Sequence, residues 1–372
     1  MSALMNRRQW LKTGTLAAVG VAVHPNPSVF SAPAPRPFNK PIRLHSNENP
    51  YGPSDPARQA IQAAFDAGCR YPGGSYGALE KMIARKEGLS PEHVVLGAGS
   101  HEVLRMIAMA YGLAGGEILT AYPTYESMER YAVSIGAHVH RVPLDADMMI
   151  DLEAMDRRTT QAVKLVYVCN PNNPTGSLLP SDAVKAFCEE VSPRSVVLVD
   201  EAYHELVDDP GYYTMTPLVR DGHNVIVSRT FSKIFGLAGL RVGYGLARPD
   251  IAARLRKFRT GSGINVLGVH AARASHGDED FIAFSRRVNA EGRDYARQAV
   301  EARGHRCLDS QTNFIFFHLG QDIRTFRAAM EQRGILVGRA FPPYMDWCRL
   351  SIGTMDEMKA FADAFQAEMS QP

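Results

Sequence analysis

The sequence has few of the features that mark metal-binding, disulfide-rich or nucleic-acid-binding proteins. Its 372 residues include only five cysteines, without a CxxC pair or a metal-binding spacing, so neither a disulfide framework nor a zinc site is indicated. Basic and acidic side chains nearly balance, at 41 against 39, and a formal net charge of only +2 gives no sign of nucleic-acid binding. A composition of 45% hydrophobic and 22% charged residues excludes disordered, fibrous and polytopic membrane proteins. We therefore expect a soluble globular protein that binds no metal and no nucleic acid.

Long apolar runs are also lacking. The run from Gly14 to Val23 follows Arg7 and Arg8 and has about half of the ~20 residues that a membrane span needs. This pattern is similar to a twin-arginine export signal, and the prolines between His24 and Pro41 are typical of a tether. We expect residues 1–41 to be an export leader with a proline-rich tether. The protein is then periplasmic and meets the membrane only through export, or cytoplasmic if the leader has another role.

After the tether, short apolar runs alternate with helical periodicity, which predicts an α/β fold with a mostly parallel sheet. We expect an N-terminal segment at 42–70 that packs on a small domain, a three-layer α/β/α large domain at 71–275, and a small α+β domain at 276–372. Strands are expected at 94–96, 117–121, 138–142, 163–168, 196–199, 225–228, 241–246, 306–308, 313–318, 335–338 and 349–352. Helices are expected at 100–111, 125–135, 181–191, 250–259, 281–303, 323–333 and from 355 onward.

One lysine, Lys233, stands among hydroxyls and glycines directly after an apolar strand. A lysine that must lose its proton to form a Schiff base needs a partly desolvated site with cationic neighbours. The hydroxyls of Thr230 and Ser232 and the guanidinium of Arg241 are suitable phosphate ligands. Together these groups are what pyridoxal phosphate requires. The alternative, a lysine on a solvated loop, leaves its neighbours unexplained.

Polar residues also follow two other predicted strands. Asp200 ends the strand at 196–199, so its carboxylate is expected in the crevice at the carboxyl end of the sheet. There it could keep a pyridine nitrogen protonated, and Tyr203 could reach the ring oxygen. An aspartate at this place can also be a simple helix cap. The segment from Asn170 to Gly176 is, by itself, only a turn.

A third candidate lies at the start of the helix at 100–111. Gly99, Ser100 and His101 open this helix after a strand, where backbone amides and the helix dipole can receive a phosphate. The third glycine of a dinucleotide fingerprint is missing, which disfavours a nicotinamide oxidoreductase. Tyr125 follows the next strand and could stack on a planar cofactor or belong to the core.

Taken together, these motifs resemble the fold-type I pyridoxal-phosphate aminotransferases of class I/II, and most closely the histidinol-phosphate aminotransferase group. The resemblance runs from about Leu44 to the C-terminus. It rests on the segments 45–53, 70–72, 173–176, 200–203, 228–241 and 349–354.

The resemblance implies a role for individual residues. Lys233 would be the Schiff-base lysine and proton carrier, and Asp200 and Tyr203 would complete the catalytic set. Tyr71 would reach the cofactor phosphate of a neighbouring subunit, which implies a homodimer with shared active sites. The cofactor would be held by Gly99, Ser100, His101, Tyr125, Asn173, Asp200, Tyr203, Thr230, Ser232, Lys233, Arg241 and Tyr71.

The resemblance also implies substrate contacts from Asn47, Arg349 and Arg339. Arg349 matches an arginine that clamps the substrate carboxylate. Arg339 is the nearest match to a second basic contact, which binds the substrate phosphate in this group, but here the loop is shorter. Phe341, Tyr344 and Trp347 give this loop an aromatic character that could favour an apolar substrate side chain.

The sequence therefore predicts a pyridoxal-phosphate-dependent aminotransferase. It would move an amino group between an L-amino acid, or an amine like histidinol phosphate, and a 2-oxo acid. Export disfavours a role in histidine biosynthesis, because that pathway is cytoplasmic. Two alternatives stay open. One is another fold-type I enzyme, such as a decarboxylase, racemase or lyase, and the other is a non-catalytic protein that binds a phosphorylated ligand.

Overall fold

The computed structural model describes residues 41–370. The expected leader falls outside these residues, apart from Pro41. Among the described residues, every helix is too short or too polar to cross a membrane.

A seven-stranded sheet forms the centre of the fold, with the order β2-β8-β7-β6-β5-β3-β4. Six strands run parallel, and β8 alone is antiparallel to its neighbours β2 and β7. This arrangement confirms the predicted α/β class. The strands are β2 (Val94–Gly97), β3 (Glu117–Tyr122), β4 (His138–Pro143), β5 (Val163–Cys169), β6 (Val196–Asp200), β7 (Val225–Thr230) and β8 (Gly243–Ala247).

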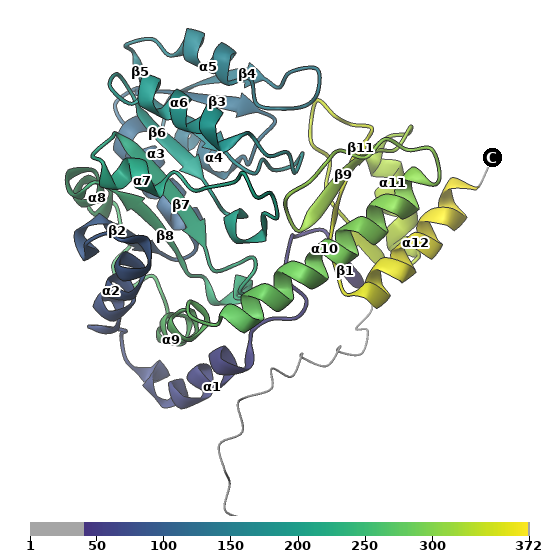
Figure 1. The fold of residues 1–372 in the computed structure, drawn as a ribbon, viewed down its shortest axis with the longest axis horizontal. Coiled ribbons are helices and arrows are strands. Elements are labelled where there is room, and N and C mark those ends of the chain that lie inside the picture. Colours follow the sequence, from purple (N-terminus) through teal and green to yellow (C-terminus); the bar gives the residue numbers. More distant parts are fainter. Residues whose placement is uncertain (1–40, 371–372) are drawn as a thin grey trace, which may run out of the picture. The chain divides into compact units, whose positions relative to one another are not determined.

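Helices cover both faces of this sheet (Figure 1) because its strands are apolar on both sides. In β2, for example, Val94 and Leu96 belong to one buried cluster and Val95 to the other. One face carries α3 (Ser100–Gly112), α4 (Ser127–Ser134) and α8 (Pro249–Arg256). The other carries α2 (Ser75–Glu87), α5 (Leu152–Arg158), α6 (Ser181–Val191), α7 (Thr216–Arg220) and α9 (Val266–Ser275).

Two small sheets and three helices enclose another buried cluster. Strand β9 (Phe314–His318) pairs antiparallel with β11 (Trp347–Ser351), and β1 (Ile42–Leu44) pairs parallel with β10 (Ile335–Val337). The helices are α10 (Glu279–Glu301), α11 (Ile323–Gln332) and α12 (Met355–Met369). Thr354 and Glu357 form a capping box that fixes the start of α12 directly after β11.

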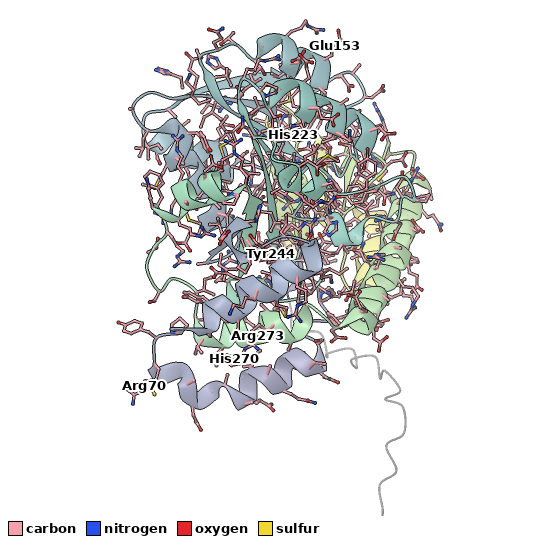
Figure 2. All side chains as sticks on the ribbon, turned by 60° about the vertical axis from the view of Figure 1, so that its left-hand side comes forward. Arg70, Glu153, His223, Tyr244, His270 and Arg273 are labelled. Atoms are coloured by element: carbon pink, nitrogen blue, oxygen red, sulfur yellow. The ribbon has the colours of Figure 1, made fainter. Side chains whose placement is uncertain are left out.

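The N-terminal segment contacts two different places. Strand β1 extends the small sheet through β10, whereas α1 (Asp55–Ala63) packs against α9. Figure 2 shows α1 beside α9, on which His270 and Arg273 are labelled. The expected packing of residues 42–70 on the small domain therefore describes β1 but not α1.

Two local predictions were wrong. Residues 306–308 form no strand, because only Cys307 makes an isolated bridge to Phe317. The helix expected from Tyr125 begins at Ser127, so the Tyr125 ring lies on the loop after β3.

Candidate active site

A cavity of about 420 Å³ lies where the parallel strands β5, β6 and β7 end. In parallel α/β sheets this edge is the usual ligand site, because the side chains of the strand ends and following loops converge there. The structure brings most of the predicted site residues to this cavity. Those that line it are Asn47, Ser100, His101, Tyr125, Asn173, Asp200, Tyr203, Thr230, Ser232, Lys233, Arg241, Arg339 and Arg349.

Lys233 lies on the loop that follows β7. Its Nζ donates a hydrogen bond to the backbone oxygen of Asn47 at 3.0 Å. Burial, together with the positive charges of Arg349 and Arg241, lowers the pKa of the amine to about 7. A large share of Lys233 is therefore neutral near neutral pH, as a nucleophilic amine must be.

The loop of Lys233 is held against the N-terminal segment by a close backbone crossing. Gly52 and Gly236 touch there, and a Cβ on either would collide with the other's backbone. Asn49 Nδ2 also donates to the backbone oxygen of Ile234 at 2.6 Å. The loop cannot move away from the cavity without breaking these contacts.

Asp200, the last residue of β6, is 1% exposed. Its Oδ1 accepts from Ser228 Oγ at 2.7 Å, and its Oδ2 accepts from the Tyr167 hydroxyl at 3.1 Å. Burial raises the pKa of the carboxyl to about 6, although these two donors stabilise the anion. A buried carboxylate with a raised pKa is suited to pair with a cationic group in the cavity.

Tyr203, Asn173 and Arg349 form a hydrogen-bonded chain across the cavity. Asn173 Nδ2 donates to the Tyr203 hydroxyl at 3.0 Å, and Arg349 Nη1 donates to Asn173 Oδ1 at 2.7 Å. Arg349 Nη2 donates to the backbone oxygen of His45 at 2.8 Å. Within the described part of the chain, Nε of Arg349 is buried without a hydrogen-bond partner.

Arg349 can act as an anion clamp. Burial lowers the pKa of its guanidinium to about 10, so the group stays charged at neutral pH. An unpaired buried donor on a charged group is costly unless a ligand satisfies it. A carboxylate is the acceptor that matches a guanidinium fork.

The start of α3 forms a second anion site with the last residue of β7 and with residues of the loop that follows it. Gly99 precedes α3 with a φ of 76°, and a Cβ there would collide with the guanidinium of Arg241. Arg241 Nη1 donates to Ser232 Oγ at 3.3 Å, and Thr230 Oγ1 donates to the same oxygen at 2.9 Å. Two hydroxyls, one guanidinium and a helix N-terminus thus meet at one point, and phosphate-binding sites in proteins use the same groups.

His101 and Tyr125 form a stacked pair at the edge of the cavity. Their ring centroids lie 5.7 Å apart at an interplanar angle of 10°, and His101 Nε2 is hydrogen-bonded to the Tyr125 hydroxyl. Burial and the charges of Arg241 and Lys233 lower the pKa of His101, and burial raises the pKa of Tyr125 to about 12. Both rings are therefore neutral at pH 7 and can lie beside a planar ligand.

Three predicted residues lie differently from the others. Gly99 does not itself line the cavity, but it directly precedes Ser100, which does. Tyr71 is 87% exposed and does not line the cavity of its own chain. Arg339 lines the cavity, but its Nη2 forms an ion pair with Glu126 Oε2 at 2.8 Å.

The rings of Phe341, Tyr344 and Trp347 pack around Phe316, and none of the three lines the cavity. The Phe341 ring also lies beneath the guanidinium groups of Arg339 and Arg349, at 4.2 and 4.9 Å from its centroid, so it supports two arginines of the cavity wall.

Sequence reasoning missed two kinds of residue. Arg327, on α11, and His45 line the cavity. Arg327 belongs to no local pattern that predicts a site, and His45 belongs to the segment 45–53 but had no role of its own there. Tyr167 and Ser228 hold Asp200 from neighbouring strands. For Tyr167 and Ser228, the one sequence feature that could have indicated a role was a hydroxyl group within an otherwise apolar strand.

Pyridoxal phosphate fits these groups. Gly99, Ser232 and Arg241 form an anion cradle, which a Cβ at Gly99 would fill. The amine of Lys233 and the carboxylate of Asp200 line the same cavity, as an aldehyde and a ring nitrogen require. Among the described residues there is no cluster of side chains suited to hold a metal ion.

Comparison with known proteins agrees with this chemistry. Residues 39–365 match the family of class I and II aminotransferases. The histidinol-phosphate aminotransferase of Moorella thermoacetica is 40% identical over 328 residues, which cover 87% of this chain and 84% of that protein. An aromatic amino acid aminotransferase of Thermobifida fusca is 37% identical over 325 residues, covering 87% of this chain and 89% of that protein.

A solved structure gives the same result. The crystal structure of histidinol-phosphate aminotransferase from Sinorhizobium meliloti, in complex with pyridoxal 5′-phosphate, superposes with a TM-score of 0.83. It is 29% identical, with 89% of this chain and 91% of that chain covered. The chain thus belongs to the class I and II aminotransferases and is a pyridoxal-phosphate-dependent transaminase of the histidinol-phosphate aminotransferase group.

Proposed function

We propose that this transaminase moves an amino group between an anionic donor and a 2-oxo acid. The donor would be an amino dicarboxylic acid or an amino phosphate of the histidinol phosphate type. The observation that carries this proposal is the gathering of Arg327, Arg339 and Arg349 around the cavity that contains Lys233. Glu126 pairs with Arg339, and Glu48 and Asp200 also line the cavity, but the basic side chains of the wall outnumber these acids. Such a wall favours a substrate with two anionic groups.

Each side chain has a distinct task in this proposal. When bound, pyridoxal phosphate supplies an electron sink for negative charge at the substrate Cα. Lys233 Nζ takes the proton from that carbon, and a pKa of about 7 suits an amine that accepts and returns a proton. Asp200 would keep the ring nitrogen protonated. Tyr203 and Asn173 would bind the ring oxygen, and Tyr125 would lie beside the ring.

The substrate would be held at two ends. Arg349 would receive the α-carboxylate through its fork, with Asn47 beside it. Arg339 and Arg327 would receive the second anionic group, for which Arg339 must exchange its contact with Glu126. A 2-oxo dicarboxylic acid would fit the same two places as amino acceptor.

A panel of amino donors tests this proposal. The purified protein, loaded with pyridoxal phosphate, is mixed separately with L-glutamate, histidinol phosphate and L-phenylalanine while the cofactor absorbance is recorded. We expect one of the two anionic donors to react fastest and to leave its oxo product. Fastest reaction with phenylalanine would contradict the proposed substrate class. Release of carbon dioxide instead of an oxo product would identify a decarboxylase.

Replacing Arg349 by lysine should weaken substrate binding. Lysine keeps the positive charge, but its ammonium group cannot donate the two parallel hydrogen bonds that a guanidinium gives to a carboxylate. We expect KM for the preferred amino acid to rise about tenfold or more, with a smaller change in kcat. Steady-state kinetics measures both. The same change at Arg287, an exposed arginine of α10, is the control. An unchanged KM in Arg349→Lys would show that this residue is not the clamp.

We further propose a homodimer in which Tyr71 completes the site of the other subunit. Tyr71 is an exposed large side chain, 87% accessible, and it follows the short helix η1 (Phe65–Cys69). Figure 2 shows the neighbouring Arg70 at the outer edge of the molecule. Sedimentation would show a dimer, and Tyr71→Ala would weaken cofactor binding. A monomer with full cofactor affinity would contradict this arrangement.

The proposed site of action is the periplasm, reached by twin-arginine export. Arg7 and Arg8 before the apolar run support this, although they lie outside the described residues. The variant with Lys at both positions should accumulate in the cytoplasm, because the signal depends on the arginine pair. Fractionation of cells that express each form measures this. Equal export of both forms would remove the proposal.

A further inference from the structure

Strand β11 reaches the hydroxyl of Tyr203 through two separate amide bridges. In the first, Arg349 donates to Asn173, whose Nδ2 donates to the tyrosine. In the second, Ser351 Oγ donates to Asn47 Oδ1 at 2.9 Å, and Asn47 Nδ2 donates to the Tyr203 hydroxyl at 3.1 Å. Asn47 of the second bridge was placed beside the substrate carboxylate, but Ser351 has no role yet.

The two bridges leave the Tyr203 hydroxyl one direction in which to donate. A phenol has one hydrogen and two lone pairs. Asn47 and Asn173 both donate to this oxygen, so its lone pairs are occupied. Its own hydrogen is therefore left for an acceptor in the cavity that Tyr203 lines.

Ser351 decides which end of the Asn47 amide faces the tyrosine. Its hydroxyl accepts from the backbone N–H of Asn47 at 2.8 Å and donates its one hydrogen to Asn47 Oδ1. Without this hydroxyl the amide is free to turn and present Oδ1 to Tyr203. The tyrosine would then donate to Asn47 instead of to the cavity.

The surroundings make this contact effective. Asn47, Tyr203 and Ser351 are each at most 3% exposed, so water cannot easily take the place of a lost partner. Asn47 also has a φ of 54°, a left-handed conformation that asparagine tolerates better than most residues. Ser351 holds both the backbone and the side chain of Asn47.

We propose that Ser351 is a positioning residue, which aims the Tyr203 hydroxyl at the cofactor by fixing the amide of Asn47. This inference rests on the proposed role of Tyr203 at the ring oxygen. The Arg349 bridge shares its guanidinium with the substrate, whereas Ser351 lies outside the substrate clamp. The Ser351 bridge thus holds Tyr203 in place whether or not substrate is bound.

The pH dependence of the cofactor absorbance tests the proposal. A hydrogen bond donated to the ring oxygen stabilises its anionic form, so weakening it makes the bound cofactor retain its proton to higher pH. In Ser351→Ala, loaded with pyridoxal phosphate, we expect the titration midpoint to rise by about one pH unit, the size expected for one lost hydrogen bond. We expect kcat to fall while KM for the amino donor stays unchanged, because Arg349 is intact.

Two further variants make the result specific. Ser351→Thr keeps the hydroxyl and should restore the wild-type midpoint. Ser275→Ala is the matched control, because Ser275 is also fully buried and its hydroxyl makes no hydrogen bond within residues 41–370. If Ser351→Ala does not fold, Asn47→Ala removes the same bridge and should show the same upward shift.

The outcomes separate this inference from the function on which it rests. A wild-type midpoint in folded, cofactor-loaded Ser351→Ala would overturn the positioning role while leaving the transaminase intact. An equal shift in Ser275→Ala would overturn it as well, since the effect would then be general. A wild-type protein that binds no pyridoxal phosphate would overturn the proposed function itself.

Discussion

Replacing Lys233 by alanine is expected to abolish transamination. Among the residues that line the cavity, Lys233 is the single lysine, so no other such amine can carry the proton at the substrate Cα. Loss of the acid–base group alone lowers rates by on the order of 10²–10⁴, and loss of the covalent attachment adds to this. Single-turnover absorbance with the preferred amino donor measures the remaining rate.

The control for this variant is Lys257→Ala, because Lys257 is exposed at the end of α8. It should leave the rate unchanged. A Lys233→Ala protein that keeps the wild-type rate would refute the assigned role and would favour a protein that binds a phosphorylated ligand without chemistry. If Lys233→Ala lost its activity but still held the cofactor covalently, the attachment point would be another lysine.

The lowered pKa of Lys233 also predicts how the rate of cofactor capture by the wild-type apoprotein depends on pH. A group with a pKa of about 7 is mostly charged below that pH and mostly neutral above it. Only the neutral amine attacks an aldehyde, so the apoprotein should capture pyridoxal phosphate faster as the pH rises through 7. A capture rate that is flat between about pH 6 and pH 8 would show that the pKa lies elsewhere.

Replacing Asp200 by alanine is the second change with a large expected effect. The buried carboxylate lines the cavity, and in the proposed mechanism it would keep the ring nitrogen protonated, without which the ring withdraws electrons poorly. We expect kcat to fall by on the order of 10³-fold or more, which corresponds to about 4 kcal/mol of activation free energy. The measurement is the rate of the first half-reaction at saturating donor.

Asp200→Asn separates charge from shape. The amide has nearly the same size but no negative charge, so it should lose nearly as much activity as alanine. An exposed acid, Asp363 of α12, serves as control when changed to asparagine. If Asp200→Asn stays within about tenfold of wild type, ring protonation does not limit the rate.

The parallel sheet explains why so much of the site could be predicted. Asn173, Asp200 and Lys233 each follow a strand with a clear apolar pattern, and the ends of neighbouring parallel strands meet at one edge. Their convergence therefore follows from the order of the elements. The roles of Asn173 and Arg349 came instead from the family resemblance, since the segment of Asn173 is by itself only a turn and nothing local distinguishes Arg349 from an arginine in a surface ion pair.

The parts of the fold and of the site that the sequence did not predict depend on contacts between segments that are distant in the chain. Strand β1 has three residues, too few for a periodic signal, and it exists because β10 pairs with it. Residues 306–308 carry a strand pattern but find only one bridging partner. Ser351 and Arg327 look like ordinary residues of a strand and a helix. Tertiary packing alone brings Ser351 to Asn47 and Arg327 to the cavity wall.

The pairing of β1 with β10 also determines when the site can be completed during synthesis. The ribosome adds roughly 5–20 residues per second, so residues 42–44 wait on the order of tens of seconds for residues 335–337 to emerge. Until then Asn47 has no Ser351 to hold it, and Arg349 has not yet been made. A nascent chain that carries Lys233 therefore lacks the substrate clamp and one wall of its cavity. The complete active site therefore forms only near the end of translation, when β1 can pair with β10.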